Sequence, residues 1–225
     1  TNANESGYTI TATLTSGYRW SDNTTGTKTF KCPLKKATPT ITLSATSGTV
    51  VKGKTMTFTE KANVAGKFTN ASGTTSVATV SPTSNTTAIA ANTAQTVTVT
   101  GVANGSSTIT INFTPTDTSN YNNAAAKTYT ATIANSATAP TNSLCVSRTY
   151  NGSAQTLVSA TTGTGYTLSG YSQTNANESG YTITATLTSG YRWSDNTTGT
   201  KTFKCPLKKA TPTITLSATS GTVVK

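Results

Sequence analysis

The sequence predicts an all-β protein built as a tandem array of small β-sandwich domains, and three observations lead to this fold class. Residues Thr1–Lys52 recur without a substitution as Thr174–Lys225, so a unit of 173 residues is duplicated in tandem. Apolar residues alternate with threonines along many short segments, which is the pattern of half-buried strands. The chain contains a single Met, and no stretch repeats its apolar residues at a helical spacing.

The first 36 residues show the strand pattern clearly. Apolar residues alternate with threonines from Tyr8 to Leu14, so one face of this strand is apolar and the other carries hydroxyl groups. After a turn-rich stretch, a second strand is expected at 28–34, with Phe30 and Cys32 on one face. Because the same residues close the complete unit near the end of the chain, this stretch is predicted to be the C-terminal half of a small β domain.

The next hundred residues are predicted to form a larger β domain. Turn signals occur at Lys52-Gly53-Lys54 and Asn104-Gly105. About seven strands in roughly 100 residues is the number typical of an immunoglobulin-like sandwich. The expected strands lie at 40–45, 55–60, 64–68, 76–80, 96–100, 108–113 and 127–134.

A small polar stretch at 136–142 that contains Pro140 is predicted to be a linker, and a second small β domain follows it. Its expected strands lie at 144–150, 155–158, 166–168 and 181–187. A domain of this size has little core, so a covalent bridge would help to stabilise it. The predicted domains are 1–36 (half of a small domain), 38–137 (immunoglobulin-like sandwich), 138–209 (complete small domain) and 210–225 (start of the next sandwich).

Three cysteines are present, and Cys32 and Cys205 occupy equivalent positions of the repeat. No His and no CxxC motif accompanies them, so a zinc site is not expected. We expect a disulfide between Cys145 and Cys205, formed in an oxidising extracellular setting. Cys32 is then unpaired within the chain, or paired with a neighbouring repeat. Two reduced core cysteines are the alternative.

The formal charge of +11 raises the question of a polyanionic partner. The lysines are spread along the chain, and their densest group is Lys28, Lys31, Lys35 and Lys36, which recurs in the second copy. No nucleic-acid-binding motif accompanies them. We therefore expect no nucleic-acid partner, and at most a weak attraction to anionic cell-wall polymers.

Catalytic patterns are missing from the sequence. Without His, neither a Ser-His-Asp nor a Cys-His arrangement can form. The six carboxylates include two duplicated pairs and suggest no glycosidase pair, and no calcium or phosphate loop is present. No apolar run approaches the ~18–20 residues that span a membrane. We expect a non-enzyme without metal, cofactor or membrane span in this segment.

Two segments resemble known repeat families of bacterial surface proteins. The larger domain resembles bacterial Ig-like (Big) domains, and the small one is similar to the MBG surface repeat. The residues that carry the first resemblance are Thr40–Ser44, Gly53–Thr59, Pro115–Tyr121 and Thr128–Ile133, and those that carry the second are Tyr150–Leu157, Glu178–Leu187 and Gly190–Asp195. The resemblance implies architecture rather than activity: a secreted or surface-displayed bacterial repeat protein.

Identical copies joined end to end build length, so the chain is expected to be a structural repeat segment of an extracellular fibre, filament or cell-surface stalk. Its expected partners are copies of itself, joined head to tail or packed side by side, and we expect it to be a window cut from a longer protein. The alternative function is an adhesin module that binds host or cell-wall glycans. Tyr191, Arg192 and Trp193 are its candidate glycan contacts, because an aromatic ring beside polar loop residues could stack on a sugar. The competing interpretation places Trp193 and Tyr191 in or beside the small core.

Overall fold

The protein is all-β, as the sequence predicted. The computed structural model describes residues 1–217 and residue 221, and within them the one helical element is the three-residue 3₁₀ turn η1 (Asn142–Leu144). No helix in this part of the chain has the length and apolar character needed to cross a membrane. Contacts divide the chain into two units, Thr1–Ile133 and Ala134–Lys225. Each unit is described below by itself.

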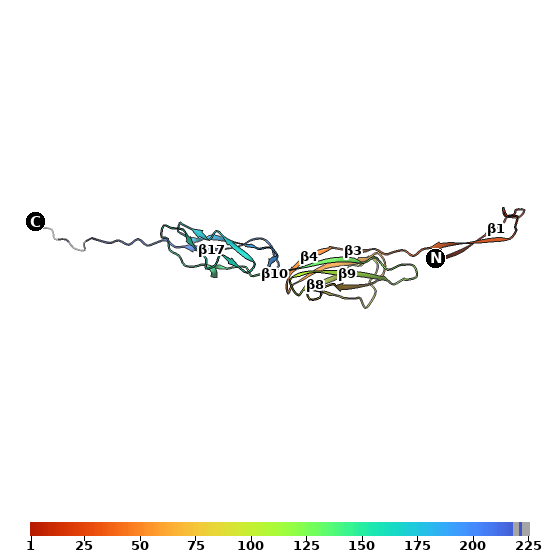
Figure 1. Cartoon of the computed structure of the whole chain (residues 1–225), viewed down its shortest axis with the longest axis horizontal. Helices are drawn as coiled ribbons and strands as arrows, with labels where there is room; N and C mark the ends of the chain where they lie inside the picture. Colours follow the sequence, from red (N-terminus) through yellow and green to blue (C-terminus); the bar gives the residue numbers. More distant parts are fainter. Residues whose placement is uncertain (218–220, 222–225) are drawn as a thin grey trace. The chain divides into compact units, whose positions relative to one another are not determined.

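Unit 1 contains a sandwich of two β-sheets (Figure 1). The first sheet has the order β3 (Ile41–Leu43), β5 (Thr55–Ala62), β8 (Gln95–Gly101) and β7 (Ala78–Ser81). The second has the order β4 (Ser47–Val51), β10 (Lys127–Ala137), β9 (Gly105–Pro115) and β6 (Gly66–Ser72). The orders β3-β5-β8-β7 and β10-β9-β6 correspond to the two sheets of a constant-type immunoglobulin domain. The predicted immunoglobulin-like class is therefore observed in this unit.

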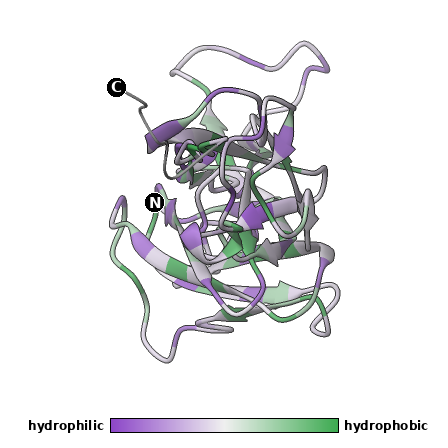
Figure 2. Cartoon of the chain, turned by 90° about the vertical axis from the view of Figure 1, so that its left-hand side faces the viewer, coloured by the Kyte–Doolittle hydropathy of each residue, from purple (hydrophilic) through white to green (hydrophobic). Residues whose placement is uncertain are grey.

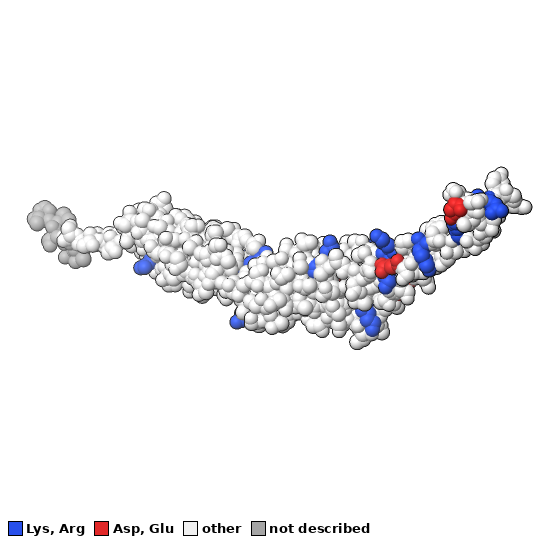
Figure 3. Space-filling model, turned by 45° about the vertical axis from the view of Figure 1, so that its right-hand side comes forward, with Lys and Arg blue, Asp and Glu red and all other residues white. Residues whose placement is uncertain are grey.

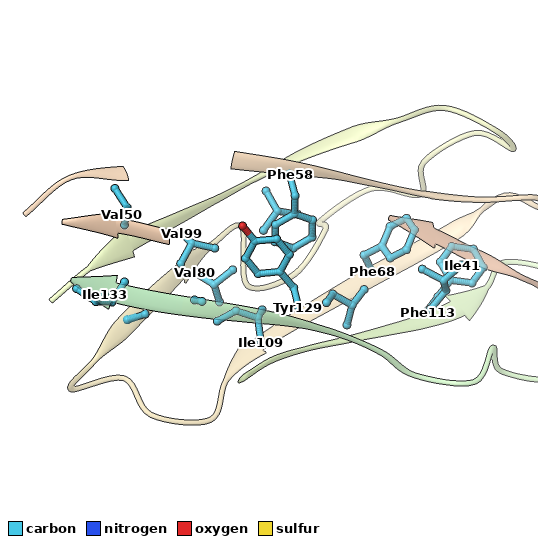
Figure 4. Close-up of a cluster of buried hydrophobic side chains, with 14 of the residues drawn as sticks. Ile41, Val50, Phe58, Phe68, Val80, Val99, Ile109, Phe113, Tyr129 and Ile133 are labelled. Carbon is cyan, nitrogen blue, oxygen red and sulfur yellow. The ribbon is translucent and has the colours of Figure 1, made fainter. Parts of the chain in front are cut away.

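The core of unit 1 forms because each strand alternates. In β9, Ile109, Ile111 and Phe113 are buried while the residues between them are partly or fully exposed, and the same alternation of hydrophobic and hydrophilic residues is visible along strands in Figure 2. The rings of Phe58 and Tyr129 stack between the sheets with centroids 4.3 Å apart (Figure 4). Burying each large apolar side chain contributes about 1.5–3 kcal/mol, so these alternating rows account for the closure of the sandwich.

Unit 1 also contains the antiparallel pair β1 (Asn4–Thr13) and β2 (Thr27–Leu34), which we call the first hairpin. Its ends are held by the loop between β9 and β10. The Ala3 amide donates to Asn120 Oδ1 at 2.6 Å, and the Ala37 amide donates to the Asn120 carbonyl at 2.9 Å. Lys36 Nζ donates to the carbonyl of Thr118 at 2.8 Å. Asp117 stiffens this loop, because its Oδ1 accepts from the Asn120 amide at 3.1 Å.

Unit 2 is built around a four-stranded sheet. The sheet has the order β12 (Thr162–Gly163), β13 (Tyr166–Ser169), β15 (Asn177–Leu187) and β17 (Lys201–Leu207). Two short pieces complete the unit: β11 (Gln155–Thr156) pairs with β14 (Ser172–Gln173), and β16 (Tyr191–Trp193) pairs in parallel with residues Asn135–Ala137 of β10. A second core, separate in composition from that of unit 1, fills this unit.

Some elements differ from the predicted ones. The stretch 136–142, predicted as a linker, begins as strand, because β10 continues to Ala137 and pairs there with β16. The predicted strand at 144–150 forms only isolated bridges, Cys145 to Val158 and Thr149 to Lys208. Strand β4 was not predicted. Within the predicted start of the next sandwich at 210–225, residues 210–217 form no strand, and residues 218–220 and 222–225 lie outside the described part.

Candidate functional site

One hairpin is built twice from identical residues. We call the pair β15–β17 the second hairpin, because its sequence repeats that of β1–β2. Both hairpins have the same register: Tyr8 lies opposite Cys32, and Tyr181 lies opposite Cys205, each after an irregularity in the pairing. The sequence of this segment therefore determines the register of the hairpin in both surroundings.

The loops that close the two hairpins also agree. Trp20 Nε1 donates to the Gly26 carbonyl at 3.0 Å, and Trp193 Nε1 donates to the Gly199 carbonyl at 2.8 Å. An Asp–Lys ion pair lies beside each indole. The matching ion pairs are Lys28–Asp22 and Lys201–Asp195. In the second copy, hydrogen bonds from Lys201 and Thr197 lower the pKa of the Asp195 carboxyl well below its usual range.

The two hairpins differ in what covers their apolar face. Side chains that are exposed in the first hairpin are buried in the second. Ile10, Phe30 and Leu34 are 41%, 54% and 45% exposed, whereas their counterparts Ile183, Phe203 and Leu207 are 0%, 7% and 0% exposed. Since the residues are identical, the difference arises from the rest of the chain and not from the hairpin itself.

The segment Ala134–Gln173 provides the cover in unit 2. Its residues in the core are Ala137, Ala139, Leu144, Cys145, Leu157, Val158, Tyr166, Leu168 and Tyr171. The segment also makes backbone ladders along the second hairpin: β13 pairs with residues 184–187 of β15, and Asn135–Ala137 pair with β16. In the first copy, the residues equivalent to β16 form no strand, and within the part of the chain that the structure describes β1 pairs with β2 alone.

A disulfide joins the covering segment to the second hairpin. Cys145 and Cys205 are bonded, with their Cα atoms 5.3 Å apart, and they are separated by 60 residues along the chain. This is the pair that was predicted from the sequence. The alternative, two reduced cysteines in the core, differs from the structure. Cys32, the counterpart of Cys205, is exposed as a free thiol.

The three candidate glycan contacts lie in the loop of the second hairpin. Trp193 is 1% exposed, belongs to the core of unit 2, and packs against Tyr166 with ring centroids 5.7 Å apart. Its ring therefore has no free face for a sugar. Tyr191 and Arg192 are half-buried, and Arg192 Nη1 donates to the carbonyl of Asn196 at 3.1 Å.

Lysine and arginine side chains are dispersed over the face of the molecule that Figure 3 shows. On the face shown in Figure 3, Lys and Arg lie singly or in small groups among uncharged surface. Across the part of the chain that the structure describes, no group of three or more His, Cys, Asp or Glu side chains is arranged to hold a metal ion.

No protein-family model and no curated protein matches the chain. Among solved structures, it is similar to domains 4 and 5 of the S-layer protein SbsC, with 30% identity over 48% of this chain and 52% of that one and a TM-score of 0.35. It is also similar to SbsC domains 1–6 (21% identity, 73% of this chain, 18% of that one, TM-score 0.34) and to the YadV chaperone (12% identity, 67% and 68%, TM-score 0.35). The chain thus spans about half the length of the first of these structures. At TM-scores this low, none of these similarities bears on function or location.

A buried carboxyl in unit 1 was missed by the sequence analysis. Glu60 is 0% exposed, and its Oε1 accepts from Gln95 Nε2 at 2.9 Å and from Asn70 Nδ2 at 3.1 Å. Burial raises the pKa of Glu60 to about 7, against the two hydrogen bonds, which lower it. The signal was present in the sequence, because Met56, Phe58 and Glu60 alternate on one face of β5.

The stability of unit 1 is expected to fall as the pH rises from about 4.5 to 7. The folded protein holds a proton on Glu60 in this range and the unfolded chain does not, so each increase in pH favours unfolding. The total loss is about 2–3 kcal/mol, since one pKa unit corresponds to about 1.4 kcal/mol. Urea unfolding at a series of pH values, followed by circular dichroism, measures it. Glu60→Gln should remove the slope, and a slope that survives this substitution contradicts the assignment.

Proposed function

We propose that the chain is a structural segment of an extracellular fibre, filament or cell-surface stalk in which 173-residue units repeat along one polypeptide. The observation that carries this proposal is the unchanged duplication of 52 residues, in a chain whose two units each have their own packed core. Closed cores of this kind allow length to grow by the addition of units, without a change to the interior of any of them.

The disulfide and the outer surfaces support an extracellular setting. Disulfides persist in oxidising compartments and are rare in the cytosol, where thiols are kept reduced. Strand faces that point away from the core carry mostly threonine; in β9, for example, Thr108 and Thr114 lie between buried residues and are themselves exposed. Hydroxyl groups of this kind keep a surface hydrated even though charged residues make up only 10% of the chain.

An adhesin role through the Tyr191–Trp193 loop has less support. The indole of Trp193 is enclosed by its own unit, and its N–H group already donates to Gly199. Tyr18, the counterpart of Tyr191 in the first copy, is 72% exposed. It belongs to the first hairpin, however, and the apolar face of the identical second hairpin is covered by protein. Copies of the same repeat are therefore the partner that we propose, rather than a glycan.

Electron microscopy under non-reducing conditions tests the structural role. Proteins with increasing numbers of the 173-residue unit are expected to appear as extended objects whose contour length grows by a constant amount with each added unit. Lateral association into ordered filaments would support the filament form of the proposal. Compact particles whose dimensions do not follow the number of units would contradict a role in building length.

A further inference from the structure

We propose that the apolar face of the first hairpin is the acceptor half of a split domain, and that it binds a segment with the sequence of Ala134–Gln173 supplied by another repeat unit. The second hairpin identifies this segment as the occupant. It has the same residues and the same register as the first hairpin, and Ala134–Gln173 covers its apolar face. The inference concerns recognition between halves of a domain and does not depend on where the protein is located.

The acceptor face combines three features that the segment satisfies in unit 2. Ile10, Phe30 and Leu34 leave an exposed apolar row, whereas their counterparts lie in one buried core with Leu157, Val158 and Leu168. The outer edge of β1 has no strand partner among the described residues, whereas the same edge of β15 pairs with β13. Cys32 is a free thiol where Cys205 is bonded to Cys145. Apolar contact, a backbone ladder and a covalent bond thus all point to the same occupant.

The first hairpin is already shaped for this partner. The pairing of Ile10 with Phe30 matches that of Ile183 with Phe203, and Asn23 and Asn196 adopt the same left-handed backbone, with φ values of 64° and 68°. A preformed acceptor loses little conformational freedom on binding. The ordering cost therefore falls mainly on the incoming segment.

A second copy of this chain is a poor source of the occupant. Each chain has one covering segment and two hairpins with the same sequence, so a segment given to the first hairpin of a neighbour leaves the second hairpin of its own chain uncovered. Such an exchange buries no additional apolar surface. The donor must be a segment that has no other hairpin to cover, and the bond between Gln173 and Thr174 shows that donor and acceptor can be consecutive in one polypeptide.

The covalent step is a thiol–disulfide exchange. We supply the donor as a peptide, Ala134–Gln173, whose Cys145 carries glutathione as a mixed disulfide. The Cys32 thiolate attacks the Cys145 sulfur, the bond between the two protein sulfurs forms, and the bond to glutathione breaks. Glutathione leaves as a thiolate and takes up a proton, so no further oxidant is needed.

The experiment mixes this peptide with the full chain and follows the adduct by mass spectrometry. A bound peptide presents its cysteine at an effective concentration near the millimolar range, so with ~10 μM peptide the adduct should form roughly 100-fold faster than with a control peptide that does not bind. The control peptide keeps Cys145 and carries Leu157→Asp and Val158→Asp. The matched control protein is Ile10→Asp, which alters an exposed side chain and leaves the two folded cores untouched.

Hydrogen exchange supplies the second readout. Those amides at 11–14 that do not already donate to β2 should become protected in the adduct, because the equivalent residues of β15 pair with β13. Equal rates with the two peptides, or an adduct without protection at 11–14, would overturn the proposal. Protection at 11–14 that appears on concentrating the chain alone would also overturn it, because a second copy would then be the occupant.

Discussion

Replacing Trp193 with alanine is expected to destabilise unit 2 by about 3–5 kcal/mol, the usual cost of removing a large aromatic side chain from a packed core. The indole is 1% exposed, lies against Tyr166, and donates a hydrogen bond to Gly199 that closes the hairpin loop. Its removal leaves a cavity and an unpaired carbonyl in a unit with a small core. The loss is measured as the change in the free energy of unfolding, from hydrogen exchange of the β15 amides at a series of urea concentrations. These amides report on unit 2 separately from unit 1.

The chain provides its own control for this substitution. Trp20 has the same neighbours in sequence and the same bond, to Gly26, but its hairpin has no covering segment. Trp20→Ala should therefore leave the unfolding of unit 2 unchanged. An equal destabilisation of unit 2 by Trp20→Ala would contradict the assignment of the Trp193 effect to the core of unit 2. If instead Trp193→Ala abolished binding to a glycan without a loss of stability, the adhesin alternative would regain its support.

Removing the disulfide is the second large effect. The double substitution Cys145→Ala and Cys205→Ala should destabilise unit 2 by about 4 kcal/mol, the chain-entropy value for a closed loop of 60 residues. The double variant is preferable to either single one, because it leaves no free thiol in the core. Cys32→Ala is the matched control and should change nothing, since that cysteine is free and exposed.

Reduction of the unaltered protein gives an independent check on the disulfide. A reductant should lower the urea midpoint of unit 2 to that of the double variant and leave unit 1 unaffected, because the described cysteines of unit 1 form no bridge. If reductant and double substitution lower the free energy of unfolding of unit 2 by less than about 1 kcal/mol, the bridge contributes less than the typical ~2–4 kcal/mol and constrains the unfolded chain little.

Local pattern was enough to predict much of the fold. Alternation placed β5, β8, β9, β10 and β15 correctly, because a period of two is sufficient to locate a strand with one buried face. The same rule places Glu60 on the buried face of β5, although its burial was not predicted. At 144–150 the pattern failed, because the fold uses these residues for a 3₁₀ turn and isolated bridges to Val158 and Lys208 rather than for a ladder.

Burial within the duplicated hairpin could not be predicted from its own sequence by any rule. Phe30 and Phe203 have identical neighbours over many residues on each side, yet one is 54% exposed and the other 7%. The difference is set by a segment outside the copy, and the predicted domain boundaries, a half domain at 1–36 and a complete one at 138–209, assigned that segment to the second hairpin. The pairing of the cysteines was thus predicted from the sequence, whereas the exposed apolar row of the first hairpin was not.

The presence of two identical acceptors and one covering segment has a consequence for folding during synthesis. Residues 134–173 leave the ribosome before residues 174–209, so for roughly 2–7 s, at ~5–20 residues per second, the covering segment has emerged without its own hairpin, while the identical first hairpin is already made. Pairing with it closes a loop of about a hundred residues, whereas pairing with the second hairpin joins consecutive segments at a lower entropic cost. Disulfide formation takes seconds to hours. Because oxidation is slow, we expect the disulfide to form after the second hairpin has been synthesised and has competed for the covering segment.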